Sequence, residues 1–164
     1  MRVQSVNRML VMSCGEKETG MKTTIFDELK SEHDEMRMMM KQLSEQYDRS
    51  TFEEFSNEIE RHMEAEEKVL YEPLRDAEGL HELIMEGYEE HVVAEDILRK
   101  LQDQKGGTEL WTTRMKVLME SVEHHVEHEE QEMFPKARTI VSEQDAIRMT
   151  EEFESAKKRV PTHA

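Results

Sequence analysis

The 164-residue sequence contains one cysteine, Cys14, with three prolines and six glycines. A single cysteine excludes an intrachain disulfide, so we expect a reducing, cytoplasmic setting. The scarcity of proline and glycine leaves few helix-breaking positions and favours an all-α fold. Basic residues are also outnumbered, since 22 Lys and Arg against 38 Asp and Glu give a formal net charge of −16. We therefore expect no nucleic-acid partner, because no basic face is available to displace counterions.

Long apolar runs are missing as well. The run MLVM at positions 9–12 is too short for the hydrophobic region of a signal peptide, and we expect no membrane partner. The length suits one domain and is too short for two ordinary ones. We expect residues 1–20 to form a flexible N-terminal tail and residues 21–160 to form a single helical domain.

Four segments carry apolar residues at steps of three and four, which is the pattern of a helix with one face on a core. These stripes span Phe26–Leu43, Phe55–Leu70, Leu80–Leu101 and Met115–Met133. We expect Pro73 and Pro135 to end the second and fourth helices, because proline lacks the backbone N–H that a helix needs. The glycine pair at positions 106–107 is expected to end the third.

The connections between these segments contain helix-start signals. A capping box at Ser50–Glu53 or Thr51–Glu54 is expected to begin the second helix. Another at Ser142–Asp145 begins a short C-terminal helix, which we expect to pack over one end of the molecule. Four helices with short connections predict an up-down-up-down antiparallel four-helix bundle with this extra C-terminal helix.

Each stripe is interrupted by a histidine, and two stripes carry a glutamate one turn after it. The interrupting residues are His33, His62, Glu66, His91, His125 and Glu129. In an antiparallel hairpin, residues equidistant from the turn lie at the same level, and the midpoints between these residues fall in the connecting loops. We therefore expect all six side chains to meet in one interior layer.

Such a layer needs a partner, because an unpaired buried polar group costs roughly 1–3 kcal/mol. A cation satisfies imidazoles and carboxylates together, and six ligands exceed what one metal ion usually takes. Two metal ions bridged by the two carboxylates are the simplest arrangement. Mixed nitrogen and oxygen ligands with open positions suit iron better than manganese or zinc. A helical interaction module whose histidines bind no metal is the alternative.

Four motifs resemble those of the hemerythrin-like (HHE cation-binding) domains: EHDEM at His33, HMEAEEKVLYEP at His62, EEHVVAED at His91 and HHVEHEEQEMFP at His125. The resemblance covers about residues 23–160. It implies a four-helix bundle that holds a non-haem di-iron centre, in which the four histidines are terminal ligands. It further implies that Glu66 and Glu129 bridge the two Fe ions.

Two positions differ from the oxygen-carrying members of that family. Where they have a fifth histidine, one turn after the third-helix ligand, this sequence has Glu95. Their last carboxylate is an aspartate five residues after its histidine, whereas Glu129 comes four after His125. The resemblance therefore points to oxidation or sensing chemistry rather than reversible oxygen carriage. Glu95 either adds a seventh, anionic ligand or turns away and pairs with a Lys or Arg.

We accordingly expect a protein that binds or senses O2, NO or peroxide through iron redox chemistry, with an electron donor or signalling partner. A di-iron enzyme that breaks down peroxide or NO, and an iron storage or delivery protein, remain alternatives. His124 and His128 also lie one turn apart. They would face the core only if the helix were rotated so that Val122 and Met133 left it, so we expect them outside the ligand set.

Overall fold

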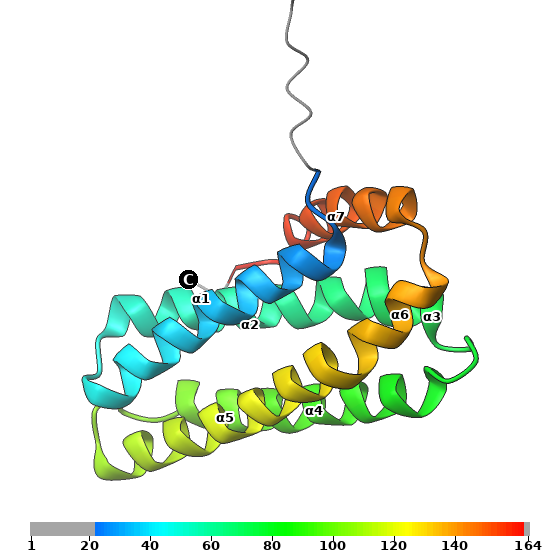
Figure 1. Cartoon of the computed structure of the whole chain (residues 1–164). Helices are drawn as coiled ribbons and strands as arrows, with labels where there is room; N and C mark the ends of the chain where they lie inside the picture. Colours follow the sequence, from blue (N-terminus) through cyan, green and yellow to red (C-terminus); the bar gives the residue numbers. More distant parts are fainter. Residues whose placement is uncertain (1–21, 163–164) are drawn as a thin grey trace, which may run out of the picture.

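The computed structural model describes residues 22–162, in which all regular structure is helical (Figure 1). The expected tail at residues 1–20 and Cys14 lie outside the described residues. The main helices are α1 (Ile25–Glu45), α2 (Arg49–Glu66), α4 (His81–Gln102), α5 (Glu109–His128) and α7 (Glu143–Lys157). Two short π-helical turns, η1 (Glu67–Tyr71) and η2 (Glu129–Met133), continue α2 and α5 directly into α3 (Glu72–Leu74) and α6 (Phe134–Ile140).

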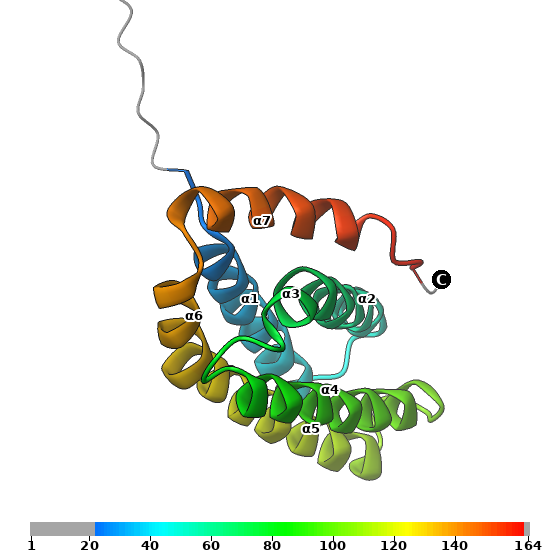
Figure 2. The same cartoon turned by 90° about the vertical axis from the view of Figure 1, so that its right-hand side faces the viewer.

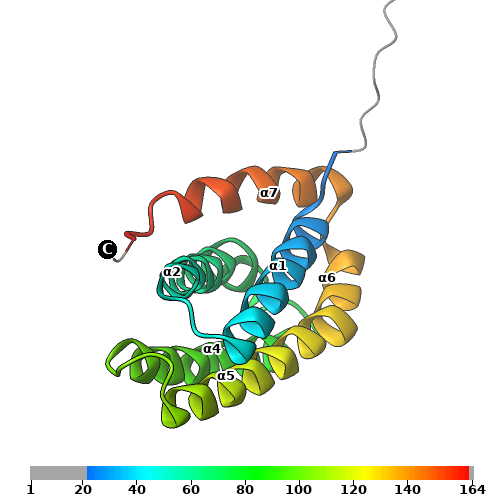
Figure 3. The same ribbon diagram turned by 90° about the vertical axis from the view of Figure 1, so that its left-hand side faces the viewer.

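The helices form the predicted antiparallel bundle. Helix α1 lies beside α2 and α5, and α4 lies beside the same two helices, so the four form a closed square (Figures 2 and 3). The predicted apolar stripes face the interior, where they form two hydrophobic clusters. One contains Leu29, Leu70 and Ile84, and the other contains Met36 and Trp111. Along the helices these clusters lie on opposite sides of the histidine positions.

The two prolines do not end their helices, contrary to the sequence prediction. Each lies in the first turn of a helix that follows a π turn, Pro73 in α3 and Pro135 in α6. In each π turn a backbone N–H bonds to the carbonyl five residues earlier, from Glu72 to Glu67 and from Phe134 to Glu129. This change of hydrogen-bonding register just before the proline lets the chain continue in the same direction, because a missing proline N–H is tolerated in a first helical turn.

The helix starts are partly as predicted. Neither Ser50–Glu53 nor Thr51–Glu54 begins α2; instead the side chain of Asp48 accepts a hydrogen bond from the Thr51 N–H, at 2.8 Å. The cap at Ser142–Asp145 is confirmed, since the Ser142 side chain accepts from the Asp145 N–H. Helix α4 ends at Gln102, before the glycine pair, and the φ of +73° at Gly107 serves the turn into α5.

The C-terminal helix α7 is present but does not cover the end of the bundle as expected. It packs along the side formed by α1, α2 and η1 (Figure 2). Its Phe153 ring meets the His62 ring edge-on at 5.9 Å, so α7 extends as far as the histidine layer. In residues 22–162, none of the helices has both the length and the apolar character required to cross a bilayer.

Candidate metal centre

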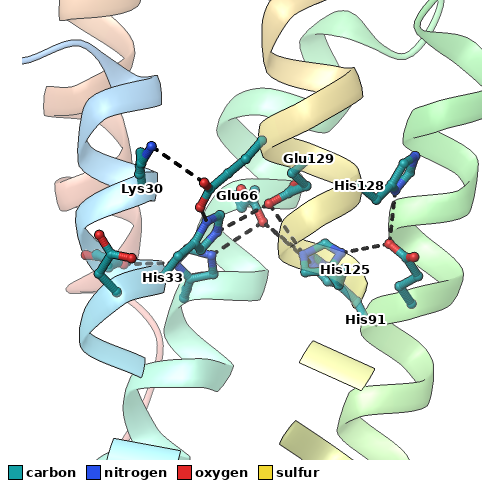
Figure 4. A network of polar contacts seen from close by, with 12 residues as sticks. Lys30, His33, Glu66, His91, His125, His128 and Glu129 are labelled. Carbon is teal, nitrogen blue, oxygen red and sulfur yellow. Dashed lines mark hydrogen bonds and ion pairs between the residues drawn. The ribbon is translucent and has the colours of Figure 1, made fainter. Parts of the chain in front are cut away.

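The structure brings the six interrupting residues together in one buried layer across the bundle (Figure 4). They come from α1, α2, α4, α5 and the start of η2, and all are buried: His33, His62, Glu66, His91, His125 and Glu129. The Glu66 and Glu129 side chains are wholly inaccessible to solvent, at 0% exposed. The layer is therefore shielded from water by the clusters above and below it.

Glu66 lies between histidines of three helices. Its Oε2 is 3.6 Å from the Nε2 of His62, 3.4 Å from that of His91 and 3.9 Å from that of His125. Glu129 lies between histidines of α1 and α5. Its Oε2 is 3.3 Å from the Nε2 of His33 and 3.5 Å from that of His125. All four imidazoles thus direct Nε2 at the two carboxylates.

The opposite ring nitrogen, Nδ1, of every one of these histidines meets a carboxylate from a neighbouring helix. The pairs are His33 with Glu130 (3.1 Å), His62 with Glu32 (2.9 Å), His91 with Glu67 (2.8 Å) and His125 with Glu90 (2.9 Å). A carboxylate can only accept, so Nδ1 of each ring carries a proton, and Nε2 keeps its lone pair whenever the ring is neutral. Such carboxylate–imidazole pairs orient histidines that ligate a metal ion.

These four pairs form a ring around the bundle. Glu32 of α1 holds the histidine of α2, Glu67 holds that of α4, Glu90 holds that of α5, and Glu130 holds that of α1. Each of these glutamates is the direct chain neighbour of a residue in the buried layer. Each of the four bundle helices, taken with the π turn that continues it, therefore supplies an inward-facing group. Each also supplies a carboxylate that orients the histidine of a neighbouring helix.

The Nε2 atoms of His91 and His125 lie within hydrogen-bond distance of each other, at 3.1 Å, but most of the other inward-facing atoms of the described residues have no partner. In residues 22–162, the buried atoms left without a hydrogen-bond partner include the Nε2 of His33 and of His62, both oxygens of Glu66 and the Oε2 of Glu129. All five present lone pairs, and an unsatisfied buried polar group is destabilising by about 1–3 kcal/mol. A cation supplies what these acceptors lack, so the donor set fits a metal site.

The geometry divides the layer into two overlapping groups. In one, ligand atoms of His33, His62 and Glu66 lie within 4.8 Å of one another, and in the other those of Glu66, His91 and His125 do. Both groups are fully buried and share Glu66. Because nitrogen and oxygen ligands are mixed, the groups suit a first-row transition metal rather than calcium or magnesium.

Burial and the neighbouring charges shift the pKa values of the two carboxyl groups in the layer in opposite directions. Burial, followed by the negative charge of Glu129, raises the pKa of Glu66 well above its ordinary value. Burial also opposes ionisation of Glu129, but the positive charge of His125 and the close approach of His33, at 3.3 Å, hold its pKa below the ordinary value. One carboxyl of the pair therefore keeps a proton that a metal ion would displace.

The histidines respond differently from one another. Burial lowers the pKa of His62 to about 4. At His33 burial acts in the same direction, but the close contact with the negatively charged Glu129, at 3.3 Å, outweighs it and raises the pKa. At His125 the charge of Glu129 and the hydrogen bond to Glu90 likewise outweigh burial. When no cation is present, the two imidazoles that contact Glu129, those of His33 and His125, thus bind a proton more readily than an ordinary histidine.

Tyr71 completes the polar layer, although the sequence did not predict it. Its O–H donates to Glu129 Oε1 at 2.5 Å, and its ring stacks on His91 with centroids 5.3 Å apart. Tyr71 comes five residues after Glu66, the spacing that a π turn brings together. The facing Gly87 leaves room for it, because a Cβ there would lie 2.6 Å from the tyrosine oxygen. The only signal in the sequence is the proline two residues later.

The remaining candidates lie outside the layer. Glu95 is exposed and lines a surface hollow together with Arg99, so its side chain does not join the six. His124 lies at the surface, with 72% of its side chain exposed and its Nε2 3.4 Å from Glu90. His128 is buried but faces Glu90 rather than the layer, at 3.1 Å. Sequence reasoning also missed the four orienting glutamates, whose only signal was adjacency to a layer residue.

Comparison with known proteins agrees with this geometry. Residues 24–137 match the family model described as the hemerythrin HHE cation binding domain. A hemerythrin-like protein of Schizosaccharomyces pombe is 30% identical over 149 residues, which are 87% of this chain and 73% of that protein. A DNA nickase of Nostoc is 25% identical over 140 residues, covering 83% of this chain but only 40% of the nickase.

No solved structure gives a significant match. The family match covers more than half of the chain, and its span contains all six residues of the buried layer. The chain carries buried His and Glu groups in the arrangement that a cation-binding site requires. It belongs to the hemerythrin HHE cation-binding domain family.

Proposed function

We propose that the buried layer holds two Fe ions and that the protein binds or senses a small diatomic ligand, O2, NO or peroxide, through iron redox chemistry. His33, His62, His91 and His125 would be terminal ligands, and Glu66 and Glu129 would bridge. The observation that carries this proposal is the set of five buried acceptor atoms that face one another without partners. When bound, the irons supply open coordination positions and exchange electrons with the ligand.

The protein's own residues would set the conditions for that chemistry. The four orienting carboxylates accept from Nδ1 of the imidazoles and turn Nε2 inward. Beside the layer lies a cavity of about 10 Å³, close to the space that one water-sized molecule needs. Besides the four histidines, only apolar side chains line it: Met36, Ile59, Met63, Ala94, Val122 and Val126. This lining favours a small, weakly polar ligand over water.

Tyr71 supports a second candidate function, an enzyme that breaks down peroxide or NO. Its hydroxyl is a buried proton donor held against Glu129, and reduction of such ligands consumes protons. The two functions differ in turnover. Under anaerobic conditions with excess reductant, an enzyme consumes many equivalents of peroxide or NO per centre, whereas a sensor is oxidised or ligated once.

Iron loading tests the proposal. The chain is freed of metal by chelation, loaded with Fe²⁺ without oxygen, desalted and analysed for iron, with optical spectra before and after exposure to air and to NO. We expect about two irons per chain, because six ligand residues suit two metal ions. After exposure to air we expect an absorption band in the near ultraviolet. Less than one iron per chain would refute the di-iron proposal. The variant E129A should lose iron, whereas the exposed-site variant E95A should keep it.

A further inference from the structure

A second cluster of metal-binding residues lies outside the buried layer, on the faces of α4 and α5 that turn toward each other at the surface. Glu86 and Glu90 are one turn apart on α4, and His124 and His128 are one turn apart on α5. Side chains four residues apart share one helix face, so each helix presents a pair. The pairs meet, with His124 Nε2 3.4 Å from Glu90 Oε1 and His128 Nε2 3.6 Å from Glu86 Oε2.

His128 is the observation that sets this cluster apart from an ordinary charged surface. Only 8% of the residue is exposed, yet in residues 22–162 its Nε2 has no hydrogen-bond partner. Its Nδ1 bonds to Glu90 Oε2 at 3.1 Å, which leaves the lone pair of the neutral ring on Nε2. Figure 4 shows His128 apart from the buried layer, with this one contact drawn. The Glu90 Oε1 atom is likewise buried without a hydrogen bond.

The surroundings favour a cation. A hollow of about 170 Å³ opens here, lined by Glu86, His124, Glu127, His128, Gln131 and Glu132. Among the described residues, no lysine or arginine lines it, so its negative charge is not neutralised within the hollow. Ligand atoms of Glu86, Glu90 and His124 already lie within 4.8 Å of one another. Two imidazoles and two carboxylates are a ligand set for a divalent first-row cation.

We propose that Glu86, Glu90, His124 and His128 form a second site for a divalent cation of the Zn²⁺ or Fe²⁺ class, separate from the buried centre. Glu90 connects the two sites. It would be a ligand of the surface site, and its Oε2, which accepts from His128 Nδ1, also accepts from the Nδ1 of His125 at 2.9 Å. A cation held at the surface is therefore one carboxylate away from a histidine of the buried layer.

Zinc binding to the full chain tests the site whether or not the buried centre takes iron. Equilibrium dialysis compares the parent with the double variant E86Q/H124A. The matched control H81A/E89Q removes one histidine and one carboxylate from exposed positions of α4 that do not line the hollow. We expect the parent and the control to bind one more Zn²⁺ per chain than the double variant, whose affinity for that ion falls at least about tenfold.

A second measurement needs no variant. In the ¹⁵N-labelled parent, Zn²⁺ should shift the ring-nitrogen resonances of His124 and His128 and leave those of His81 unchanged, because a ligating nitrogen loses its free lone pair. Equal zinc stoichiometry and affinity in the parent and the double variant would overturn the proposal. So would unshifted resonances of His124 and His128 at saturating zinc, whatever the dialysis shows.

Discussion

Replacing Glu66 by methionine should stabilise the metal-free protein and abolish its stabilisation by iron. The Glu66 side chain is 0% exposed, and neither of its oxygens has a hydrogen-bond partner within the described residues. Methionine has nearly the same length and removes both oxygens without opening a large cavity. Relief of one unsatisfied buried group should raise the free energy of unfolding by about 1–3 kcal/mol. In a chain of this size that corresponds to a rise in Tm of roughly 2–12 °C.

The effect of iron should have the opposite sign. In the parent, free Fe²⁺ at a hundred times its dissociation constant adds about 2.7 kcal/mol to the free energy of unfolding. In E66M this gain should largely disappear, because a bridging ligand of both groups is lost. Thermal unfolding followed by circular dichroism, in chelator and in anaerobic Fe²⁺, measures both quantities. The two proteins should therefore exchange their order of stability between the two conditions.

A matched control makes the comparison specific. Glu130 lies in η2, beside the buried layer, and its carboxylate is partnered by the His33 Nδ1 at 3.1 Å and by Arg37 at 3.4 Å. The same change there, E130M, should lower the stability of the metal-free protein, because it removes interactions instead of an unsatisfied group. If E66M also destabilises the metal-free protein, the carboxylate is a satisfied core group and the reasoning is wrong. An iron-independent Tm in the parent would refute it equally.

Three further changes test other parts of the site. Y71F removes the donor to Glu129 and should lower the free energy of unfolding in chelator by about 1–3 kcal/mol, measured by chemical denaturation; unchanged stability would contradict the bond. G87A places a Cβ 2.6 Å from the tyrosine oxygen and should destabilise by about 1–3 kcal/mol despite alanine's better helix propensity, and a gain in stability would show that Tyr71 moves freely. Iron binding should release protons at neutral pH, because the pKa of Glu66 is raised well above its ordinary value and that of His33 is also raised. Protonated His33 and His125 compete with the metal, so iron affinity should already fall as the pH drops toward 6.5 from above; an affinity independent of pH would contradict these shifts.

Periodicity was enough to predict the bundle and the convergence of the six residues. Each apolar stripe defines which face of its helix is buried, and a histidine within the stripe, such as His33 between Leu29 and Met36, must follow its neighbours inward. The equal distances from the turns then place the histidines at one level. Both inferences depend only on the geometry of a single helix and of an antiparallel hairpin, and the structure has both features.

The helix ends were less predictable, because they depend on competing local interactions. Several polar residues near position 50 could cap α2, and the sequence does not rank Asp48 above Ser50 or Thr51. A proline is a helix breaker in general, but a preceding π turn removes the conflict at Pro73. Whether such a turn forms depends on what the shifted side chains meet, and at Tyr71 that is Glu129 on another helix.

The sequence by itself determined the all-α fold, the buried faces of the helices and the identity of the six residues that interrupt them, because helical periodicity is a local property of the chain. Only the tertiary structure decided which of the many acidic residues orient the histidines, because Glu32, Glu67, Glu90 and Glu130 each act on a different helix. It also separated the three histidines of the HHVEHEEQEMFP motif. His125 faces Glu66 and Glu129 inside the bundle, whereas His124 and His128 meet α4 at its surface, and that division depends on where the neighbouring helix lies.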